Sequence, residues 1–246
     1  MVILALEVVP LTKLKPFLFF DFDDTLVDFQ ACARVAMKVA LTKLGQSYTD
    51  EDYQTYQEIN HGWWKRLEAG EITRDELRFG RIRDFFSAME WTHLDPTLGT
   101  ELFMQELGGQ VVLYPDAQPV VLELQAQGWK IGLISNGLPD VQPQRISLAG
   151  FEGIFDPAII SGQVGFQKPD SRIFTLASSR ARKAGRLLAD QKIIMIGDNP
   201  EADIRGAREV GWETLQFVPE KTPPGKGQFS QWADFLPALE ELVQNL

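Results

Sequence analysis

The chain has 246 residues, of which 44% are hydrophobic and 24% charged, a composition typical of a folded protein with one large core or a core and a smaller insert. Its formal net charge of −10 repels nucleic-acid backbones and anionic membranes, so we expect neither as a partner. One cysteine, Cys32, and two histidines leave no intrachain disulfide and little from which to build a zinc site or a histidine-dependent triad.

The first 14 residues are predicted to be an N-terminal extension. Residues 1–11 are apolar, but Glu7 interrupts them, and they lack a preceding basic region and a clear cleavage site. The segment is also too short to span a bilayer. We expect a loosely held extension, or read-through from an upstream start codon, and a protein that acts in the cytoplasm.

The first structured element is an apolar strand over residues 16–20, and it leads into the run 21–25 (DFDDT). If the chain continued as a strand, Asp21 and Asp23 would face the same side. Two adjacent carboxyl groups often divide roles, one ionised and attacking while the other holds a proton for a leaving group. The alternative for such a pair is a solvated acidic turn.

An all-helical segment is predicted over residues 28–112, where a sheet protein would ordinarily alternate strands and helices. Thr49 and Thr73 each precede an acidic residue by three positions, a pattern typical of capped helix starts. Helices are expected over residues 30–44, 49–69, 73–86 and 96–107. We interpret the segment as an insert that follows the first strand.

From residue 113 onward, strands and helices alternate. Strands are expected at 130–134, 157–160, 192–196 and 213–217, helices at 115–127, 140–149, 170–185, 200–210 and 235–246, and a loop at 219–228. Such alternation implies right-handed βαβ units and a parallel sheet with helices on both faces. The predicted fold is α/β, a doubly wound parallel sheet formed by residues 15–27 and 113–246, with an inserted helical cap at 28–112.

Two polar runs suit a phosphate group. Ser135 and Asn136 follow the strand 130–134 and offer a hydroxyl and exposed backbone N–H groups. Lys168 stands just before an expected helix start. Taken alone, Ser-Asn-Gly is an ordinary turn and a lysine is a solvated side chain, so these residues matter through their position. Ligands bind at the carboxyl ends of the strands in open α/β sheets, where we expect both runs.

The last run supplies carboxylates. Asp198 follows the apolar strand 192–196, and Asp203 lies five residues later in the next helix. With Asp21 opposite, these groups form a hard oxygen site suited to Mg²⁺, which takes few protein carboxylates and keeps several waters.

The order of these runs resembles the motifs of the haloacid dehalogenase-like (HAD) superfamily. The run 21–25 resembles the first motif, Ser135 the second, Lys168 the third, and the run 197–203 the fourth. The helical insert between the first two motifs resembles the α-helical cap of subclass I. The resemblance covers the chain from about residue 15 to its end.

This resemblance implies phosphoryl transfer through an aspartyl-phosphate. Asp21 would attack phosphorus, and Asp23 would protonate the leaving oxygen and then activate the hydrolytic water. Ser135 and Lys168 would hold the phosphoryl oxygens, and with Asn136 they are the expected phosphate contacts. Asp23 also argues against dehalogenation, because a halide leaving group needs no proton.

The resemblance also implies a magnesium site. Its expected ligands are the Asp21 carboxylate, the Asp23 backbone carbonyl and Asp198. Asp203 would support these ligands or orient Lys168.

Within the superfamily, residues 59–67, 70–76 and 165–169 resemble bacterial house-cleaning nucleoside 5′-monophosphatases. The expected substrate is a small phosphorylated metabolite, namely a pyrimidine or non-standard nucleoside 5′-monophosphate. Trp63 and Arg66, with the neighbouring tryptophan at 64, are predicted to contact its base or sugar; the alternative is that the tryptophans pack the cap against the core.

Other basic residues are predicted to be solvated. Arg81 and Arg83 are placed on an exposed helix face, and so is the basic run 180–186.

Three other functions remain open. A capped phosphatase for a sugar phosphate, phosphoglycolate or an acylneuraminate 9-phosphate, or a mutase, would use the same catalytic residues. A phosphoacceptor signalling module also phosphorylates an aspartate beside Mg²⁺ and lysine, but such domains are about half this length. A catalytically inactive binding protein is disfavoured because all four runs are intact. The protein is expected to be a monomer or a homodimer.

Overall fold

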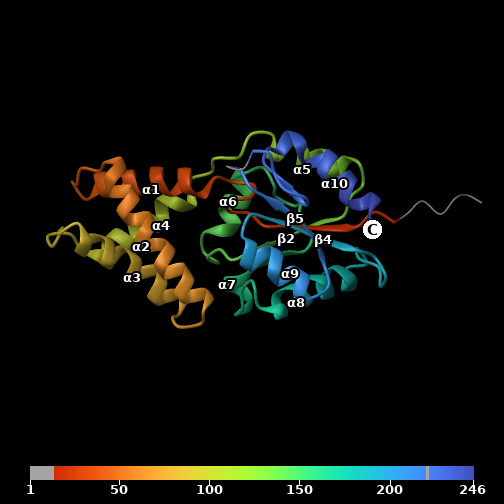
Figure 1. Ribbon diagram of the computed structural model, residues 1–246. Coiled ribbons are helices and arrows are strands. Elements are labelled where there is room, and N and C mark those ends of the chain that lie inside the picture. Colours follow the sequence, from red (N-terminus) through yellow and green to blue (C-terminus); the bar gives the residue numbers. More distant parts are fainter. Residues whose placement is uncertain (1–13, 220–221) are drawn as a thin grey trace, which may run out of the picture.

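The computed structural model describes residues 14–219 and 222–246, so the predicted N-terminal extension lies outside the described residues except for Leu14. In this part of the chain, parallel strands form one six-stranded sheet in the order β3-β2-β1-β4-β5-β6 (Figure 1). The strands are β1 (Phe17–Phe20), β2 (Ile131–Ser135), β3 (Ala158–Ile160), β4 (Ile193–Gly197), β5 (Glu213–Phe217) and β6 (Gln228–Phe229). The predicted doubly wound parallel sheet is confirmed.

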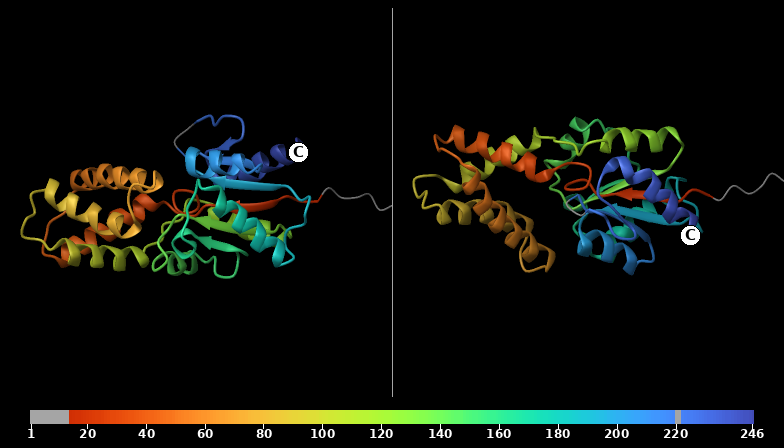
Figure 2. Two further views of the ribbon diagram at one scale, coloured as in Figure 1. Left: turned by 90° about the horizontal axis from the view of Figure 1, so that it is seen from below. Right: turned by 45° about the horizontal axis from the view of Figure 1, so that its top comes forward.

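Strand β1 lies at the centre of the sheet and its four side chains are all buried. Because successive side chains point to opposite faces, Leu18 and Phe20 pack with helices α5 (Ala117–Ala126) and α10 (Phe235–Gln244). Phe17 and Phe19 pack on the other face, against α8 (Ser171–Lys183) and α9 (Gly206–Glu209). Helices therefore cover both faces of the sheet (Figures 1 and 2).

Four helices form a separate body beyond the carboxyl ends of the strands (Figure 2). They are α1 (Phe29–Lys43), α2 (Asp50–Glu68), α3 (Arg74–Ala88) and α4 (Pro96–Gly108), and we call them the helical body. α1 packs on α4 and α2 packs on α3. Thr49 and Thr73 form the predicted capping boxes with Asp52 and Glu76. No helix within the described residues combines the length and the apolar character that crossing a membrane requires.

The chain enters and leaves the helical body at neighbouring points. Val27 and Leu113 form an antiparallel bridge, and the Asp28 N–H donates to the Val112 carbonyl at 2.8 Å. On another side, Arg74 of α3 donates to Ser161 and Gln167 of the core, each at 3.0 Å. The helical body is thus held at its two chain crossings and again through α3.

Some short elements differ from the prediction. β6 lies at the end of the predicted loop 219–228, where two residues pair with β5 and are too few to show a strand period. The predicted helix 200–210 consists of a π-helical segment, η1 (Pro200–Arg205), followed by α9. Its first turn is widened because the N–H groups of Asp203 and Ile204 both donate to the Asn199 carbonyl.

The remaining short elements border the sheet. α6 (Gln142–Leu148) lies within the predicted helix 140–149, whereas α7 (Ser161–Val164) and the 3₁₀ helix η2 (Trp232–Asp234) were not predicted. Both unpredicted elements are at most one helical turn, too short for a periodic signal.

The close packing of α2 and α3 depends on a glycine. A Cβ atom at Gly80 would lie 2.1 Å from Cη2 of Trp63, whose buried indole donates from Nε1 to Asp84 at 3.0 Å. We expect Gly80→Ala to destabilise the protein by about 1–3 kcal/mol in urea denaturation, because overpacking outweighs the better helix propensity of alanine. Gly62→Ala is the matched control, since no atom lies within 4 Å of its added Cβ. It should be neutral or stabilising by up to about 1 kcal/mol; equal effects of both substitutions would contradict this account.

Candidate active site

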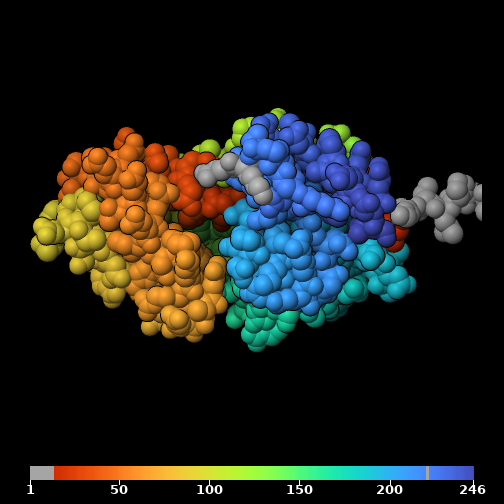
Figure 3. All heavy atoms as spheres, viewed as in Figure 1, coloured from red at the N-terminus to blue at the C-terminus, as the bar shows by residue number. Residues whose placement is uncertain are grey.

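A cavity of about 690 Å³ lies between the carboxyl ends of the strands and the helical body. Figure 3 shows the surface indented where the helical body meets the core. The seven predicted core residues all line this cavity: Asp21, Asp23, Ser135, Asn136, Lys168, Asp198 and Asp203. Strand order reverses around β1, so the side chains that follow β1, β2 and β4 meet at one edge of the sheet.

Lys168 is clamped between two carboxylates. Its Nζ lies 2.5 Å from Oδ1 of Asp21 and 2.6 Å from Oδ1 of Asp203, and all three side chains are buried. Burial lowers the pKa of Lys168, but Asp203 and Asp21 outweigh that effect, so its pKa is raised and the ammonium stays charged. The lysine therefore presents a fixed positive charge at Asp21.

Asn136 holds the backbone of Lys168. Its Oδ1 accepts from the Lys168 N–H at 2.9 Å, and its Nδ2 donates to the Lys168 carbonyl at 3.0 Å. Both ends of the amide are therefore engaged. The side chain therefore positions Lys168, and the predicted contact of phosphate with the backbone N–H of Asn136 stays a prediction.

Ser135 is poised to donate a hydrogen bond. Its Oγ accepts from the Gly137 N–H at 3.1 Å and from Nε2 of Gln142 at 2.8 Å. Because these donors occupy the oxygen lone pairs, the hydroxyl proton is left for an acceptor in the cavity. A phosphoryl oxygen is such an acceptor.

Asp23 is held by two residues that the sequence did not reveal. Arg145 donates from Nη1 to its Oδ1 at 2.5 Å, and Gln142 donates from Nε2 to its Oδ2 at 2.9 Å. Both residues lie on α6 and are 1% exposed. Gln142 also reaches Ser135, so one amide group links the second motif to Asp23. Their spacing of three residues, on the first helix after Ser135, was the available signal.

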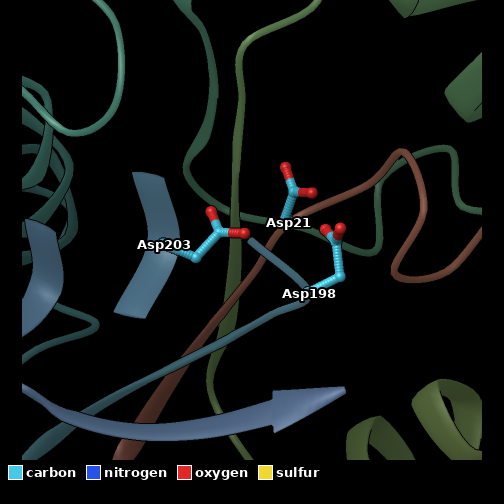
Figure 4. Close-up of side chains that lie close together, drawn as sticks. All are labelled: Asp21, Asp198 and Asp203. Atoms are coloured by element: carbon cyan, nitrogen blue, oxygen red, sulfur yellow. The ribbon is translucent and has the colours of Figure 1, made fainter. Parts of the chain in front are cut away.

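Asp21, Asp198 and Asp203 form a carboxylate cluster (Figure 4). One oxygen of each lies within 4.8 Å of the others. Only glycine fits at 197, because a Cβ there would lie 2.4 Å from the Asp203 carboxylate. Thr25 donates to Asp198 at 3.1 Å, but no cation among the described residues pairs with Asp198. A hard divalent cation such as Mg²⁺ fits this oxygen donor set.

The electrostatics of the cluster favour a cation. Burial, with added repulsion from Asp203 and Asp21, raises the pKa of Asp198 to about 9. Burial also raises the pKa of Asp21 to about 7, although Lys168 opposes the shift. Lys168 alone therefore leaves the cluster short of positive charge.

The cap residues differ from prediction. Trp63 faces the interior of the helical body with Leu67 and Leu77, and Arg66 stacks on its outer side, 4.6 Å from the ring centroid. Neither lines the cavity, which contradicts their predicted contact with substrate. The alternative, packing of the cap against the core, does not describe Trp63 either, because its ring packs between α2 and α3 inside the helical body. Trp64 lines the cavity instead, because adjacent residues point about 100° apart on a helix.

The prediction that Arg81 lies on an exposed helix face is also wrong. This side chain is 2% exposed and lines the cavity, because α2 and α4 cover this side of α3. Arg83 is exposed as predicted.

Comparison with known proteins identifies relatives along most of the chain. A family model described as haloacid dehalogenase-like hydrolase matches residues 17–211. Pyrimidine 5′-nucleotidase YjjG of Escherichia coli is 29% identical over 229 residues, which cover 93% of this chain and 96% of that protein. Pyrimidine 5′-nucleotidase PynA of Streptococcus pneumoniae is 30% identical over 213 residues, covering 82% and 84%.

A solved structure is similar over nearly the same extent. It is a crystal structure of YfnB from Bacillus subtilis, described as a HAD-hydrolase bound to magnesium. The TM-score is 0.81 at 25% identity, covering 92% of this chain and 100% of that one.

We expect Mg²⁺ to raise the thermal unfolding temperature more at about pH 8.5 than at about pH 6. The pKa values of Asp198 and Asp21, about 9 and about 7, lie above their ordinary value of 3.8, so Mg²⁺ must displace more protons at the lower pH. For the same reason, the metal-free folded state binds more protons than the unfolded state, and its stability falls as pH rises from about 4 toward these values.

At a hundredfold excess over its Kd, Mg²⁺ should raise the free energy of unfolding by about 2.7 kcal/mol, which corresponds to a rise in Tm of roughly 5–10 °C in a chain of this size. Asp198→Asn is the control and should remove most of the shift. A shift that is equal at both pH values, or that survives in Asp198→Asn, would contradict the assigned site.

Proposed function

Since the chain belongs to the haloacid dehalogenase-like hydrolases, we propose that it is a magnesium-dependent phosphomonoesterase acting on pyrimidine nucleoside 5′-monophosphates. The observation that carries the proposal is the arrangement around Asp21. A buried carboxylate lies 2.5 Å from a charged lysine, beside two further carboxylates and a free hydroxyl proton. These are the groups that in-line phosphoryl transfer to a carboxylate needs.

In the first step, an Asp21 oxygen attacks phosphorus and the bond from phosphorus to the ester oxygen breaks. Asp23, carrying a proton, gives it to the departing oxygen, so a neutral alcohol leaves and an aspartyl-phosphate remains on Asp21. Lys168 and the Ser135 hydroxyl bind the phosphoryl oxygens as negative charge moves onto them. Gln142 and Arg145 keep Asp23 in place.

In the second step, water attacks phosphorus and passes its proton to the Asp23 carboxylate. The bond from phosphorus to Asp21 breaks, which releases inorganic phosphate and restores the Asp21 carboxylate. The hydrogen bonds from Arg145 and Gln142 to the two oxygens of Asp23 suit the ionised form that this step requires.

Mg²⁺ would be held by Asp21 and Asp198, with the Asp23 backbone carbonyl as a further ligand and Asp203 in support. When bound, the ion neutralises charge on the phosphoryl group and on the carboxylate cluster.

The substrate class is supported by the relatives and by the cavity. Two relatives that each cover more than four-fifths of the chain are named pyrimidine 5′-nucleotidases. The helical body, proposed as a cap over residues 28–112, contributes Trp64 and several polar side chains to the wall of the cavity that Asp21 also lines. An aromatic ring beside hydrogen-bonding groups suits a nucleobase.

We expect Asp21→Asn to abolish release of inorganic phosphate from UMP and CMP in Mg²⁺ buffer, because an amide cannot form the acyl-phosphate. The wild type should prefer these nucleotides to purine nucleotides, sugar phosphates and phosphoglycolate. Phosphate-release assays over this panel, with circular dichroism to verify folding, make the measurement. Activity that survives in Asp21→Asn would refute the nucleophile, whereas a preference for sugar phosphates would refute only the substrate class.

Arg145→Lys and Gln142→Ala should lower kcat/KM for UMP by roughly 10–100-fold, a large share of what a general acid contributes. For 4-nitrophenyl phosphate the loss should be much smaller, since nitrophenolate leaves without a proton and kcat/KM reports only the first step. Asp23→Asn should likewise lower kcat/KM much more for UMP than for 4-nitrophenyl phosphate. Adding Arg145→Lys or Gln142→Ala to Asp23→Asn should lower kcat/KM for UMP little further. Equal losses with both substrates would contradict this role of the two residues. For Arg145 they would indicate an effect on overall structure, and for Gln142 an effect through the Ser135 hydroxyl that it also contacts.

A further inference from the structure

A buried arginine stands in the cavity wall that the helical body provides. Arg81 of α3 donates from Nη1 to Oδ1 of Asn60 on α2 at 2.8 Å, and its Nη2 lies 3.4 Å from the Met104 sulfur on α4. All three residues line the same cavity as Asp21. Arg81 and Asn60 thus form a polar pair, from α3 and α2, in a wall that also contains Trp64, Lys65 and Glu68.

The charge of Arg81 is uncompensated among the described residues. No carboxylate of these residues forms an ion pair with it, and its Nε is buried without a hydrogen-bond partner. Its other neighbours are the Met104 sulfur and the Phe103 ring, whose centroid is 5.3 Å from the guanidinium carbon. A buried cation and an unpaired donor both cost stability, so a group from outside that offers oxygen acceptors would be bound favourably.

Asn60 adds a second free donor. Its Oδ1 already accepts from Arg81, and the hydroxyl of Tyr56 lies 3.4 Å away. No acceptor among the described residues pairs with its Nδ2. The pair therefore keeps its own acceptor occupied and, in a wall of the cavity, has N–H groups without an acceptor among the described residues.

We propose that Arg81 and Asn60 form the subsite that selects the leaving group, by binding an acceptor oxygen carried by the alcohol part of the substrate. This inference rests on the proposed function and deepens it. The chemistry suits two sources, the ring carbonyl of a pyrimidine or a carboxylate. A guanidinium donates a hydrogen bond to the oxygen of the first and two parallel hydrogen bonds to the oxygens of the second. Trp64 and Leu107 line the same cavity and favour a leaving group with a planar apolar surface.

The test compares substrates that differ in this acceptor. With the Mg²⁺-loaded enzyme, kcat/KM is measured for UMP, phosphoglycolate and ribose 5-phosphate, the last of which lacks both a ring carbonyl and a carboxylate. Arg81→Met should lower kcat/KM by roughly 10–100-fold for the substrate whose acceptor is read, and leave ribose 5-phosphate unchanged. Arg83→Met, two residues along on the exposed side of α3, is the matched control and should leave all three unchanged.

Folding and binding controls keep the result decisive. Replacing a buried unpaired cation by an apolar side chain should not lower the unfolding temperature, and Arg81→Lys is the second variant if it does. Calorimetry on Asp21→Asn should show that adding Arg81→Met raises the Kd of UMP or phosphoglycolate at least tenfold.

Each outcome has one meaning. A loss confined to UMP identifies the ring carbonyl as the acceptor, and a loss confined to phosphoglycolate identifies the carboxylate. Unchanged kcat/KM and Kd, or equal losses that include ribose 5-phosphate, would overturn the subsite. A wild type that binds UMP through Arg81 yet releases no phosphate would instead refute the proposed function.

Discussion

Four aspartates lie close together where the strands of the sheet end, and the placement of the other polar side chains of the site follows from their mutual repulsion. Asp21, Asp23, Asp198 and Asp203 all line one cavity, where low solvent exposure makes like charges costly. Two buried cations neutralise part of this charge. The Lys168 ammonium forms ion pairs with Asp21 and Asp203, and the Arg145 guanidinium forms one with Asp23. Among residues 14–219 and 222–246, the Asp198 side chain receives only a hydroxyl donor from Thr25. Positive charge is therefore most lacking at Asp198, where burial and the neighbouring carboxylates raise the pKa to about 9 and where a divalent ion would be held.

The sheet explains why the chemistry gathers where it does, and why much of it could be predicted. Each core motif is a short polar run directly after a buried strand or at a helix start, so local sequence reveals both its chemistry and its position. Strand β1 pairs with β2 on one side and β4 on the other, which brings these runs together. The Asp21 N–H donates to the Ile196 carbonyl at 2.8 Å, which fixes the backbone of Asp21 to the neighbouring strand.

What the sequence did not reveal is decided by packing between elements distant in the chain. In the sequence, Arg145 is indistinguishable from a solvated helix arginine. In the structure, α6 places its guanidinium against the rings of Phe22 and Phe29. The exposed side predicted for Arg81 is wrong because α2 and α4 enclose that face of α3, and local periodicity cannot report that. Trp63 and Trp64 are adjacent in sequence, and only the packing of Trp63 on Gly80 decides which ring faces the cavity.

The paired crossings at Val27 and Leu113 have a consequence for how such a protein can change. An inserted segment whose two ends lie side by side disturbs the surrounding domain little, because the domain has to bridge the same short distance whatever the segment contains. Helices α1–α4 could therefore be exchanged for another helical unit that fits the same gap, while Lys168 and the aspartates keep their places. In such a chimaera the choice of alcohol would follow the donor of the helices, and the rate of bond cleavage would follow the donor of the sheet.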